Sequence, residues 1–257
     1  MQFTDLRGKV AIVTGASRMK GIGAAICRAL AAQGCAIFFT AYPKYDALAF
    51  PGPATTKDSE HLATELRAMG VPVAFLEIDL AQPDCAVRIL DAAEHLLGAP
   101  SILVNNAAHS ARDGFKKLDA SGLDAHYAVN VRGTALLSVE FARRYHFGYG
   151  GRIINLTSGQ EREPLAGELA YAATKGAISA FTRALAKEVA SKGINVNAVD
   201  PGPTDTGWMS EEFKSRLIDS NANDRVGLPE DAARLVVFLA SEAAARLSGE
   251  IIHARGI

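Results

Sequence analysis

Short apolar runs alternate with segments of helical periodicity along the whole chain, and this alternation restricts the fold more than any other feature. The apolar runs are typical of strands buried on both faces. They are Val10–Thr14, Ala36–Thr40, Val73–Ile78, Ile102–Asn105, Arg152–Leu156, Ile194–Val199 and Glu250–His253. The helical segments are Gly21–Gln33, Ser59–Met69, Asp84–Leu97, Ser121 to about Phe147, Glu168–Ser191 and Glu230–Ser241. Alternating strands and helices form right-handed crossovers. We therefore expect an α/β fold, with a doubly wound seven-stranded parallel sheet and helices on both faces.

Two segments interrupt the alternation. Residues 42–57 contain three prolines and a glycine, which predicts a loop. Residues 201–228 form a long excursion before the last helix, and excursions of this length are often binding elements. We expect a substrate lid at about 204–228. Because the alternation continues to the C-terminus, the chain is expected to be a single domain, 1–257.

Composition excludes several classes of function. The net charge of the 257 residues is -1 and no basic block stands out, so nucleic acid and anionic membrane surfaces are not expected as partners. No apolar run reaches membrane-spanning length. The three cysteines show no metal-ligand spacing, which predicts buried thiols in a reducing compartment and no metal site. With no signal-like N-terminus, the chain is expected to be cytoplasmic.

A glycine-rich turn, Thr14–Gly23, joins the first strand to the first helix. Glycines there let the backbone approach a pyrophosphate, and the helix N-terminus supplies free N–H groups. The alternative is a turn that only packs the helix tightly on the strand. Its place at the first strand–helix junction favours dinucleotide binding, and hence a sheet of the Rossmann type.

The end of the second strand bears on the choice of cofactor. Sites for NAD usually carry an acidic residue there, but Thr40–Lys44 contains none. Arg18 and Lys20 lie in the glycine-rich turn, where cations fit the 2′-phosphate of NADP. The alternative is that both are solvated surface charges. We expect NADP to be preferred, with NAD possible.

Tyr171 and Lys175 are the strongest candidates for chemistry. Four residues apart on a helix, they share one face. A nearby ammonium favours the phenolate and lowers the pKa of a phenol. The hydroxyl of Ser158 could hold a carbonyl oxygen beside it, which suits proton transfer in carbonyl and alcohol chemistry. Taken alone, such a pair is more often an exposed contact.

Taken together and in order, these motifs resemble the short-chain dehydrogenase/reductase family of the compact single-domain type. The turn from Gly15 to Gly23 resembles the family's phosphate-binding turn, although it is two residues longer. Asn105–Ala108 resembles its Asn-Asn-Ala-Gly motif, and Pro201–Thr206 resembles its Pro-Gly segment with a downstream Thr. The family's catalytic tetrad is matched in type and approximate spacing by Asn130, Ser158, Tyr171 and Lys175.

The resemblance implies a role for each member of the tetrad. Tyr171 would be the general acid in reduction and the base in oxidation. Lys175 would lower the pKa of Tyr171 and bind the nicotinamide ribose, and Ser158 would orient the substrate carbonyl. Asn130 would lie at a break in the long helix and hold a water in a proton relay to Lys175. The alternative for Asn130 is a purely structural bond.

The resemblance also implies a set of cofactor contacts. Asp79 would bind the adenine amino group, and Asn106 would lie near the adenosine ribose. Thr204 and Thr206 would secure the carboxamide side of the nicotinamide. Asp79 could instead be a turn residue at a strand end, and Thr206 a helix N-cap. The full expected set is Gly15, Ser17, Arg18, Gly21, Ile22, Gly23, Tyr42, Asp79, Leu80, Asn106, Ala107, Tyr171, Lys175, Pro201, Gly202, Thr204 and Thr206.

The implied function is an NADP-dependent oxidoreductase that moves hydride between nicotinamide and a ketone or secondary alcohol. The nearest general resemblance is to a 3-oxoacyl-thioester reductase or a related carbonyl reductase. Alternatives are an epimerase, a dehydratase, a sugar, steroid or other alcohol dehydrogenase, and a non-catalytic nucleotide sensor. The partners expected are a small carbonyl or alcohol substrate and further copies of the chain, because the family pairs its two long helices across a two-fold axis. A tetramer is favoured and a dimer is possible.

Three further departures from the family pattern are visible. Ala108 stands where the family mostly has Gly, and Asp200 stands before Pro201 where Asn is commoner. The C-terminus lacks the Asp-Gly-Gly ending often seen.

Overall fold

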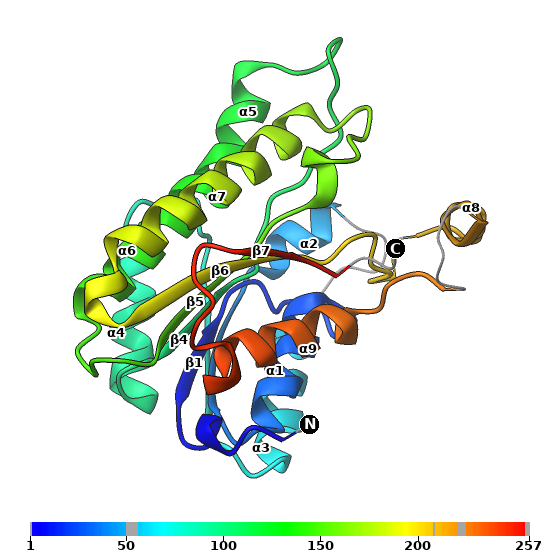
Figure 1. Ribbon diagram of the computed structural model, residues 1–257. Helices are drawn as coiled ribbons and strands as arrows, with labels where there is room; N and C mark the ends of the chain where they lie inside the picture. The colour runs from blue at the N-terminus through cyan, green and yellow to red at the C-terminus, as the bar shows by residue number, and fades with distance from the viewer. Residues whose placement is uncertain (1, 50–55, 208, 220–224, 255–257) are drawn as a thin grey trace.

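The sheet has the order and direction expected of a dinucleotide-binding fold. The computed structural model describes residues 2–49, 56–207, 209–219 and 225–254. In these residues seven strands pair in parallel in the order β3-β2-β1-β4-β5-β6-β7 (Figure 1). The strands are β1 Val10–Val13, β2 Ala36–Ala41, β3 Val73–Glu77, β4 Ile102–Asn105, β5 Gly151–Leu156, β6 Ile194–Asp200 and β7 Ile251–His253. The predicted fold class is confirmed.

Strand order reverses at β1, which pairs with β2 on one side and β4 on the other. Ligands of open α/β sheets bind beyond the carboxyl ends of the strands at such a switch point. The glycine-rich turn follows β1, and the Asn105–Ala108 segment follows β4. The topology therefore brings these two motifs to the same edge of the sheet.

Helices cover both faces of the sheet, as Figure 1 shows. The helices on one face are α1 Ile22–Ala31, α3 Thr56–Ala68 and α9 Pro229–Ala240, and those on the other are α4 Cys85–Leu97, α6 Thr134–Arg144 and α7 Leu169–Glu188. The side chains of β1 alternate between the two cores. Ala11 and Val13 pack in the core beneath α1, while Ile12 packs in the core beneath α4 and α6.

The prediction of a loop at residues 42–57 was wrong. The chain forms α2 Pro43–Ala49 there, and α3 begins at Thr56, three residues earlier than expected. Residues 50–55 lie outside the described chain. Proline suits the first position of a helix because its missing N–H has no intrahelical partner there. Asp46 in the first turn of α2 adds a favourable charge at the N-terminus.

The long helix expected from Ser121 to about Phe147 has three parts. They are α5 Ala120–His126, a π-helical turn η2 Tyr127–Gly133, and α6, which ends at Arg144. Tyr145 leaves the helix in an extended conformation and is buried, with its ring 5.9 Å from that of Phe141. This burial ends the helix before the glycines that were expected to end it.

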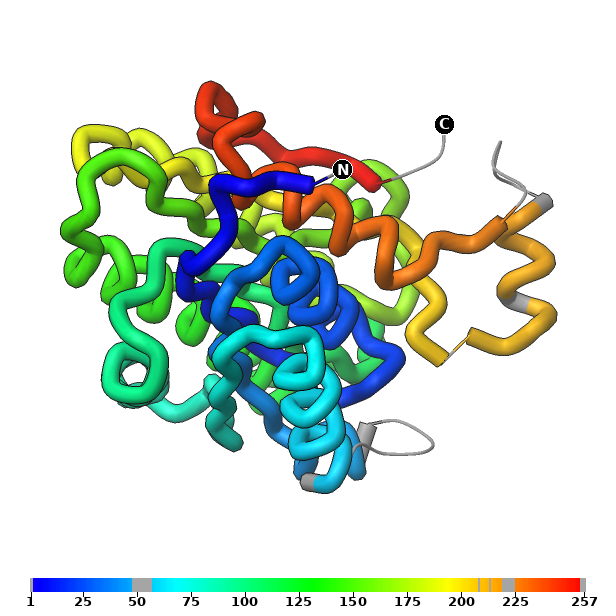
Figure 2. The backbone as a smooth tube through the Cα atoms, turned by 90° about the horizontal axis from the view of Figure 1, so that it is seen from below, coloured from blue at the N-terminus to red at the C-terminus, as the bar shows by residue number. Residues whose placement is uncertain are grey.

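The excursion after β6 contains a further helix, α8 Glu211–Asp219. Figure 2 shows α8 projecting from the body of the molecule. Lys214 of α8 bonds the carboxylate of Asp205 at 2.8 Å, which ties the helix to the segment that leaves β6. Residues 208 and 220–224 of the predicted lid lie outside the described chain, and its assignment as a lid stays a prediction.

Candidate active site

The glycine-rich turn packs directly on the segment after β4. Gly15 has φ +73, and a Cβ built on it would lie 2.6 Å from the Cα of Ala107. A Cβ on Gly23 would lie 2.5 Å from the carbonyl oxygen of Gly15. The hydroxyl of Thr14 accepts hydrogen bonds from the backbone amides of Asn106 and Ala107, at 3.0 and 3.1 Å. Only glycine fits at both positions, as the motif requires.

Asn106 holds the turn from the other side. Its side-chain amide donates to the carbonyl oxygens of Thr14 and Gly15, at 2.8 and 2.9 Å. Both amide hydrogens are therefore engaged by the protein. The residue expected near the adenosine ribose thus positions the phosphate turn through its side chain.

The two extra residues of the turn form a compact loop ahead of α1. The amide of Gly21 donates to the carbonyl oxygen of Arg18 at 2.9 Å, and Gly21 then caps α1, which begins at Ile22. The α1 N-terminus has no side-chain cap. Its first amides are therefore oriented for an anion, in agreement with the expected pyrophosphate site.

The structure brings three further predicted residues together beside β2. The hydroxyl of Ser17 accepts from the amide of Tyr42 at 2.8 Å. The phenol of Tyr42 hydrogen-bonds Asp79, and burial together with that carboxylate raises the pKa of Tyr42. Asp79 also accepts from the amide of Ala81 at 2.8 Å, so it serves as a turn residue as well. Leu80, the next residue, packs closely on Gly133, because a Cβ built on Gly133 would lie 2.8 Å from the carbonyl oxygen of Leu80.

Arg18 and Lys20 differ in their surroundings. Arg18 donates to the hydroxyl of Thr206 at 2.8 Å, and its Nε lies 3.8 Å from a carboxylate oxygen of Asp46. Lys20 is exposed, and its Cδ would lie 3.8 Å from a Cβ on Gly207. Thr40–Lys44 contains no acidic residue, but Asp46 lies two residues further on in α2, where no helix was expected, and its carboxylate faces Arg18. Burial raises the pKa of Asp46, and Arg18 and Ser17 act in the opposite direction.

The Pro-Gly segment after β6 folds back on itself. Thr204 is buried, and its hydroxyl lies 3.1 Å from the carbonyl oxygens of both Pro201 and Gly202. Gly202 has φ +65, and its amide donates to the buried carboxylate of Asp200 at 2.9 Å. Through the bond between Thr206 and Arg18, this segment meets the phosphate turn.

Tyr171 and Lys175 share one face of α7, as the spacing predicts. The Nζ of Lys175 lies 5.6 Å from the centre of the Tyr171 ring and donates to the carbonyl oxygen of Leu156 at 2.6 Å. Lys175 is 5% exposed, and this burial lowers its pKa to about 8. Burial raises the pKa of Tyr171, and the charges of Glu168 and Asp200 act in the same direction.

Lys175 is not among the groups that shift the pKa of Tyr171, and its expected role in lowering that pKa stays a prediction. The ammonium is held by a carbonyl oxygen at the end of β5, and desolvation of the phenol dominates. Tyr171 is consequently protonated at neutral pH, which is the form that a general acid requires.

Asn130 lies in the π-helical turn η2, so the long helix is interrupted where the resemblance implies. Its Oδ1 accepts from the amide of His109 at 2.7 Å, and its Nδ2 donates to the carbonyl oxygen of His109 at 2.9 Å. Nδ2 also donates to the hydroxyl of Thr174 at 3.0 Å, and Thr174 bonds the carbonyl oxygen of Tyr171. The structural alternative for the side chain of Asn130 is thus realised. Its expected role in a water relay stays a prediction.

Ser158 lies two residues after the end of β5 and is half-buried. Among the described residues, none hydrogen-bonds its hydroxyl, which leaves that group able to orient a substrate oxygen. The carbonyl that anchors Lys175 belongs to Leu156, two residues earlier. Lys175, one turn from Tyr171 on α7, is thereby tied to the end of β5, two residues before Ser158 in the chain.

Sequence reasoning missed several residues around the site, namely Tyr45, Asp46, Asp113 and Thr174. Asp46 could have been found if Pro43 had been recognised as the start of a helix. The others make contacts that join distant segments, for which one sequence carries no signal.

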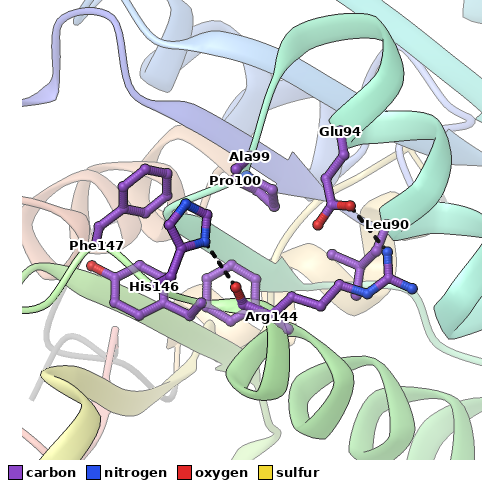
Figure 3. A pocket seen from close by; sticks show the side chains of 9 residues that line it. Leu90, Glu94, Ala99, Pro100, Arg144, His146 and Phe147 are labelled. Atoms are coloured by element: carbon purple, nitrogen blue, oxygen red, sulfur yellow. Dashed lines mark hydrogen bonds and ion pairs between the residues drawn. The ribbon is translucent and has the colours of Figure 1, made fainter.

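The small pocket in Figure 3 does not belong to this site. It lies between the ends of α4 and α6, before β4 begins, and its volume is about 10 Å³. Two lining residues of this pocket bond each other, since Arg144 donates to the carboxylate of Glu94 at 3.1 Å. A ring nitrogen of His146 lies 3.0 Å from the carbonyl oxygen of Arg144. A space of this size holds at most one water. Among the described residues no group of three acidic, His or Cys side chains could hold a metal ion.

Comparison with known proteins agrees with this geometry. A family model described as enoyl-(acyl carrier protein) reductase matches residues 15–256. The uncharacterized oxidoreductase YjdA of Bacillus subtilis is 51% identical over 250 residues, which are 96% of each chain. A short-chain dehydrogenase from Burkholderia cenocepacia, solved in complex with NADP, has a TM-score of 0.87 at 32% identity, with 98% of both chains covered. The chain belongs to the short-chain dehydrogenase/reductase family.

Membership makes this protein an oxidoreductase that acts on CH–OH or C=O groups. The 3-oxoacyl-(acyl-carrier-protein) reductase FabG of Aquifex aeolicus is 33% identical over 254 residues, 98% of this chain and 97% of its own. The glycine-rich turn follows β1 and Lys175 is bonded to the end of β5, and both strands belong to the same sheet. None of the described helices combines the length and apolar composition needed to cross a bilayer.

Proposed function

We propose that this short-chain dehydrogenase/reductase is an NADP-dependent carbonyl reductase, with a 3-oxoacyl thioester as the first candidate substrate. The observation that carries the proposal is that Lys175, one turn from Tyr171 on α7, donates to the carbonyl oxygen of Leu156 at the end of β5, two residues before Ser158. The phenol of Tyr171 is protonated, Lys175 is buried, and Ser158 is half-buried. This is the set of groups that protonation of a substrate carbonyl needs.

The residues present fit a nicotinamide dinucleotide. The close approach of Gly15 to Ala107 leaves a side-chain-free turn, and the uncapped N-terminus of α1 supplies amides for a pyrophosphate. Ser17, Tyr42 and Asp79 would hold the adenosine end, and Lys175 with the Pro201–Thr206 segment would hold the nicotinamide end. A bound nicotinamide supplies or accepts the hydride.

Preference for NADP rests on Arg18. Its guanidinium is half-buried at the phosphate turn and is oriented by Thr206 and Asp46. A guanidinium matches a phosphate better than an ammonium does. The carboxylate of Asp46 would repel the 2′-phosphate of NADP. We therefore propose that Arg18 turns from this carboxylate to the 2′-phosphate when NADP binds. The NADP complex of the Burkholderia relative supports the same choice.

The protein's own residues would perform the proton transfer. Tyr171 donates its proton to the carbonyl oxygen that Ser158 orients. The buried ammonium of Lys175 then stabilises the phenolate that remains, because opposite charges attract strongly where water is excluded. Because its pKa is raised, the phenol of Tyr171 carries its proton at neutral pH, which is the form that donates in reduction.

The proposal is tested by following nicotinamide absorbance on purified protein. NADPH and NADH are supplied separately with an acetoacetyl thioester, a β-keto ester, a diketone, a quinone and a keto sugar. Turnover that prefers NADPH and the thioester supports the proposal. Preference for the keto sugar favours a sugar dehydrogenase, and preference for NADH contradicts the assignment of Arg18. Coenzyme binding without turnover would favour the nucleotide-sensing alternative.

We further propose a cytoplasmic homotetramer. A groove of about 440 Å³ runs between α6 and α7. Its apolar lining includes Val139, Phe181 and Leu185, and its charged lining residues are Arg143, Glu188 and Lys192. A second copy of the chain could cover it across a two-fold axis. Light scattering after gel filtration decides between tetramer, dimer and monomer. The free, buried state of Cys27, Cys35 and Cys85 suits a reducing compartment.

A further inference from the structure

The loop that follows β4 is fixed at its start by the predicted catalytic residue Asn130. Both the amide and the carbonyl oxygen of His109 bond the Asn130 side chain, at 2.7 and 2.9 Å. A side-chain amide that accepts and donates to one residue acts as a two-point clamp. The loop therefore cannot shift along the chain direction without breaking both bonds.

Two more side chains hold the next residues of the loop. The phenol of Tyr45 in α2 donates to the carbonyl oxygen of Ser110 at 3.0 Å and accepts from its amide at 2.7 Å. Nε2 of the buried His126 accepts from the amide of Ala111 at 3.1 Å. Its Nδ1 lies 2.7 Å from the carbonyl oxygen of Gly122, which requires the proton to be on Nδ1.

The loop ends on the helix that carries Tyr171. Oδ1 of Asp113 accepts from the amide of Leu169 at 2.7 Å, and Oδ2 accepts from the amide of Ala170 at 2.9 Å. These are the first two residues of α7. Glu168, which occupies the N-cap position itself, makes no side-chain cap bond. The cap of α7 thus comes from a segment more than 50 residues earlier in the chain.

The backbone reinforces this junction. The amide of Asp113 donates to the carbonyl oxygen of Gly167 at 2.8 Å, so the two segments meet as a pair. Partial burial acts to raise the pKa of Asp113, but hydrogen bonds from Ala170, Leu169 and Gly114 hold it below its usual range. The carboxylate is therefore ionised at neutral pH and accepts at both oxygens.

We propose that Asp113 is a positioning residue for Tyr171. Tyr171 is the third residue of α7, within the turn whose free amides Asp113 binds. Without the cap this turn frays, and the phenol loses the fixed place that proton transfer requires. A misplacement of about 1 Å at a reacting group can cost about 100-fold in rate. The proposal rests on the proton-donor role of Tyr171 in the proposed function.

The test compares Asp113→Ala and Asp113→Asn with a matched control, Asp119→Ala. Asp119 caps α5 by accepting from the amide of Gly122 at 2.8 Å, so its removal costs one cap on a helix without Tyr171. Each variant is assayed for kcat on the best substrate of the panel, for the Kd of NADPH by fluorescence, and for Tm.

Asp113→Ala should lower kcat by about 10- to 100-fold while the Kd of NADPH stays within about 2-fold. Asp113→Asn keeps one acceptor oxygen and should fall between wild type and Ala. Asp119→Ala should lower Tm by a similar amount but leave kcat within about 2-fold of wild type. Hydrogen exchange at Leu169 and Ala170 should speed up in both Asp113 variants.

Two results would overturn the proposal. One is a kcat of Asp113→Ala equal to that of Asp119→Ala. The other is a loss of kcat with a rise of the Kd for NADPH by the same factor, because equal losses of catalysis and binding indicate a general loss of structure. If Asp113→Ala does not fold, Asp113→Asn carries the same comparison. Tyr171→Phe assayed in parallel separates the outcomes, because normal activity in that variant contradicts the proposed function itself.

Discussion

The ammonium of Lys175 donates to the carbonyl oxygen of Leu156 at 2.6 Å and stands 5.6 Å from the centre of the Tyr171 ring. The lysine is thus anchored to the end of β5. Its burial lowers its pKa to about 8, whereas burial of the phenol raises the pKa of Tyr171. The site consequently holds a protonated phenol beside a lysine whose pKa is lowered by burial.

The pKa of Lys175 predicts a dependence of stability on pH. Between about pH 8 and its ordinary value of 10.5, the unfolded chain binds a proton at Lys175 that the folded chain does not. Stability rises with pH wherever the unfolded state binds more protons. The free energy of unfolding of wild type minus that of Lys175→Met should therefore rise from pH 8 to pH 10, by about 2 to 3 kcal/mol at most. Urea unfolding of coenzyme-free protein checks this, and parallel pH curves would contradict it.

Tyr171→Phe should abolish turnover and leave the Kd of NADPH largely unchanged. The substitution removes the proton donor but keeps the ring that packs beside Lys175. Loss of a general acid costs about 100- to 10,000-fold in rate. Steady-state assays give kcat and fluorescence titration gives the Kd. Activity near that of wild type would sink the proposed mechanism.

Arg18→Ala should weaken NADPH and spare NADH. Hydrogen bonds to charged groups contribute about 1.5 to 3 kcal/mol, so the KM for NADPH should rise by about 10- to 100-fold. Lys20→Ala is the matched control, because Lys20 lies in the same turn but is exposed. It should change the KM by less than about 3-fold, as expected for a solvated charge. Equal effects on both coenzymes would instead point to a role of Arg18 in folding the turn.

Gly15→Ala should destabilise the protein and abolish coenzyme binding, whereas Gly8→Ala should cause only strain. The two glycines have nearly the same backbone conformation, with φ +73 and +77. Nothing lies within 4 Å of a Cβ on Gly8, but a Cβ on Gly15 meets the Cα of Ala107 at 2.6 Å. Strain alone costs about 1 to 3 kcal/mol. Thermal unfolding and NADPH titration of both variants measure the difference, and equal losses would show that the contact with Ala107 does not matter.

The sheet could be predicted from sequence because strands buried on both faces read as uninterrupted apolar runs. Val10–Val13 and Ile102–Asn105 are buried throughout, and the expected strands include both. The helix that begins at Pro43 was not predicted because the three prolines and the glycine in residues 42–57 are typical of a loop. In the structure this proline starts a helix, and the tertiary contacts of Tyr45 and Asp46 hold that helix in place.

The candidate site was predictable wherever a motif is local. The glycine turn and the Tyr171–Lys175 pair depend on short spacings, and both lie together in the fold. Asp113 shows the limit, since it caps a helix that begins at Leu169 and nothing in its own surroundings marks it. Helical spacing places a lysine near Tyr171, but it does not show how far the phenol is removed from water, which raises the pKa of Tyr171.

The bond between Arg18 and Thr206 spans 188 residues and has a consequence for synthesis of the chain. A ribosome delivers β1, β2 and β3 first, and these strands pair with one another at one side of the sheet. The phosphate turn is complete once Asn106, which follows β4, has been made and bonds it, but the hydroxyl that orients Arg18 arrives only when about four-fifths of the protein has been made. A nascent chain can build the nucleotide cradle well before it acquires the full setting of the residue proposed to select the coenzyme.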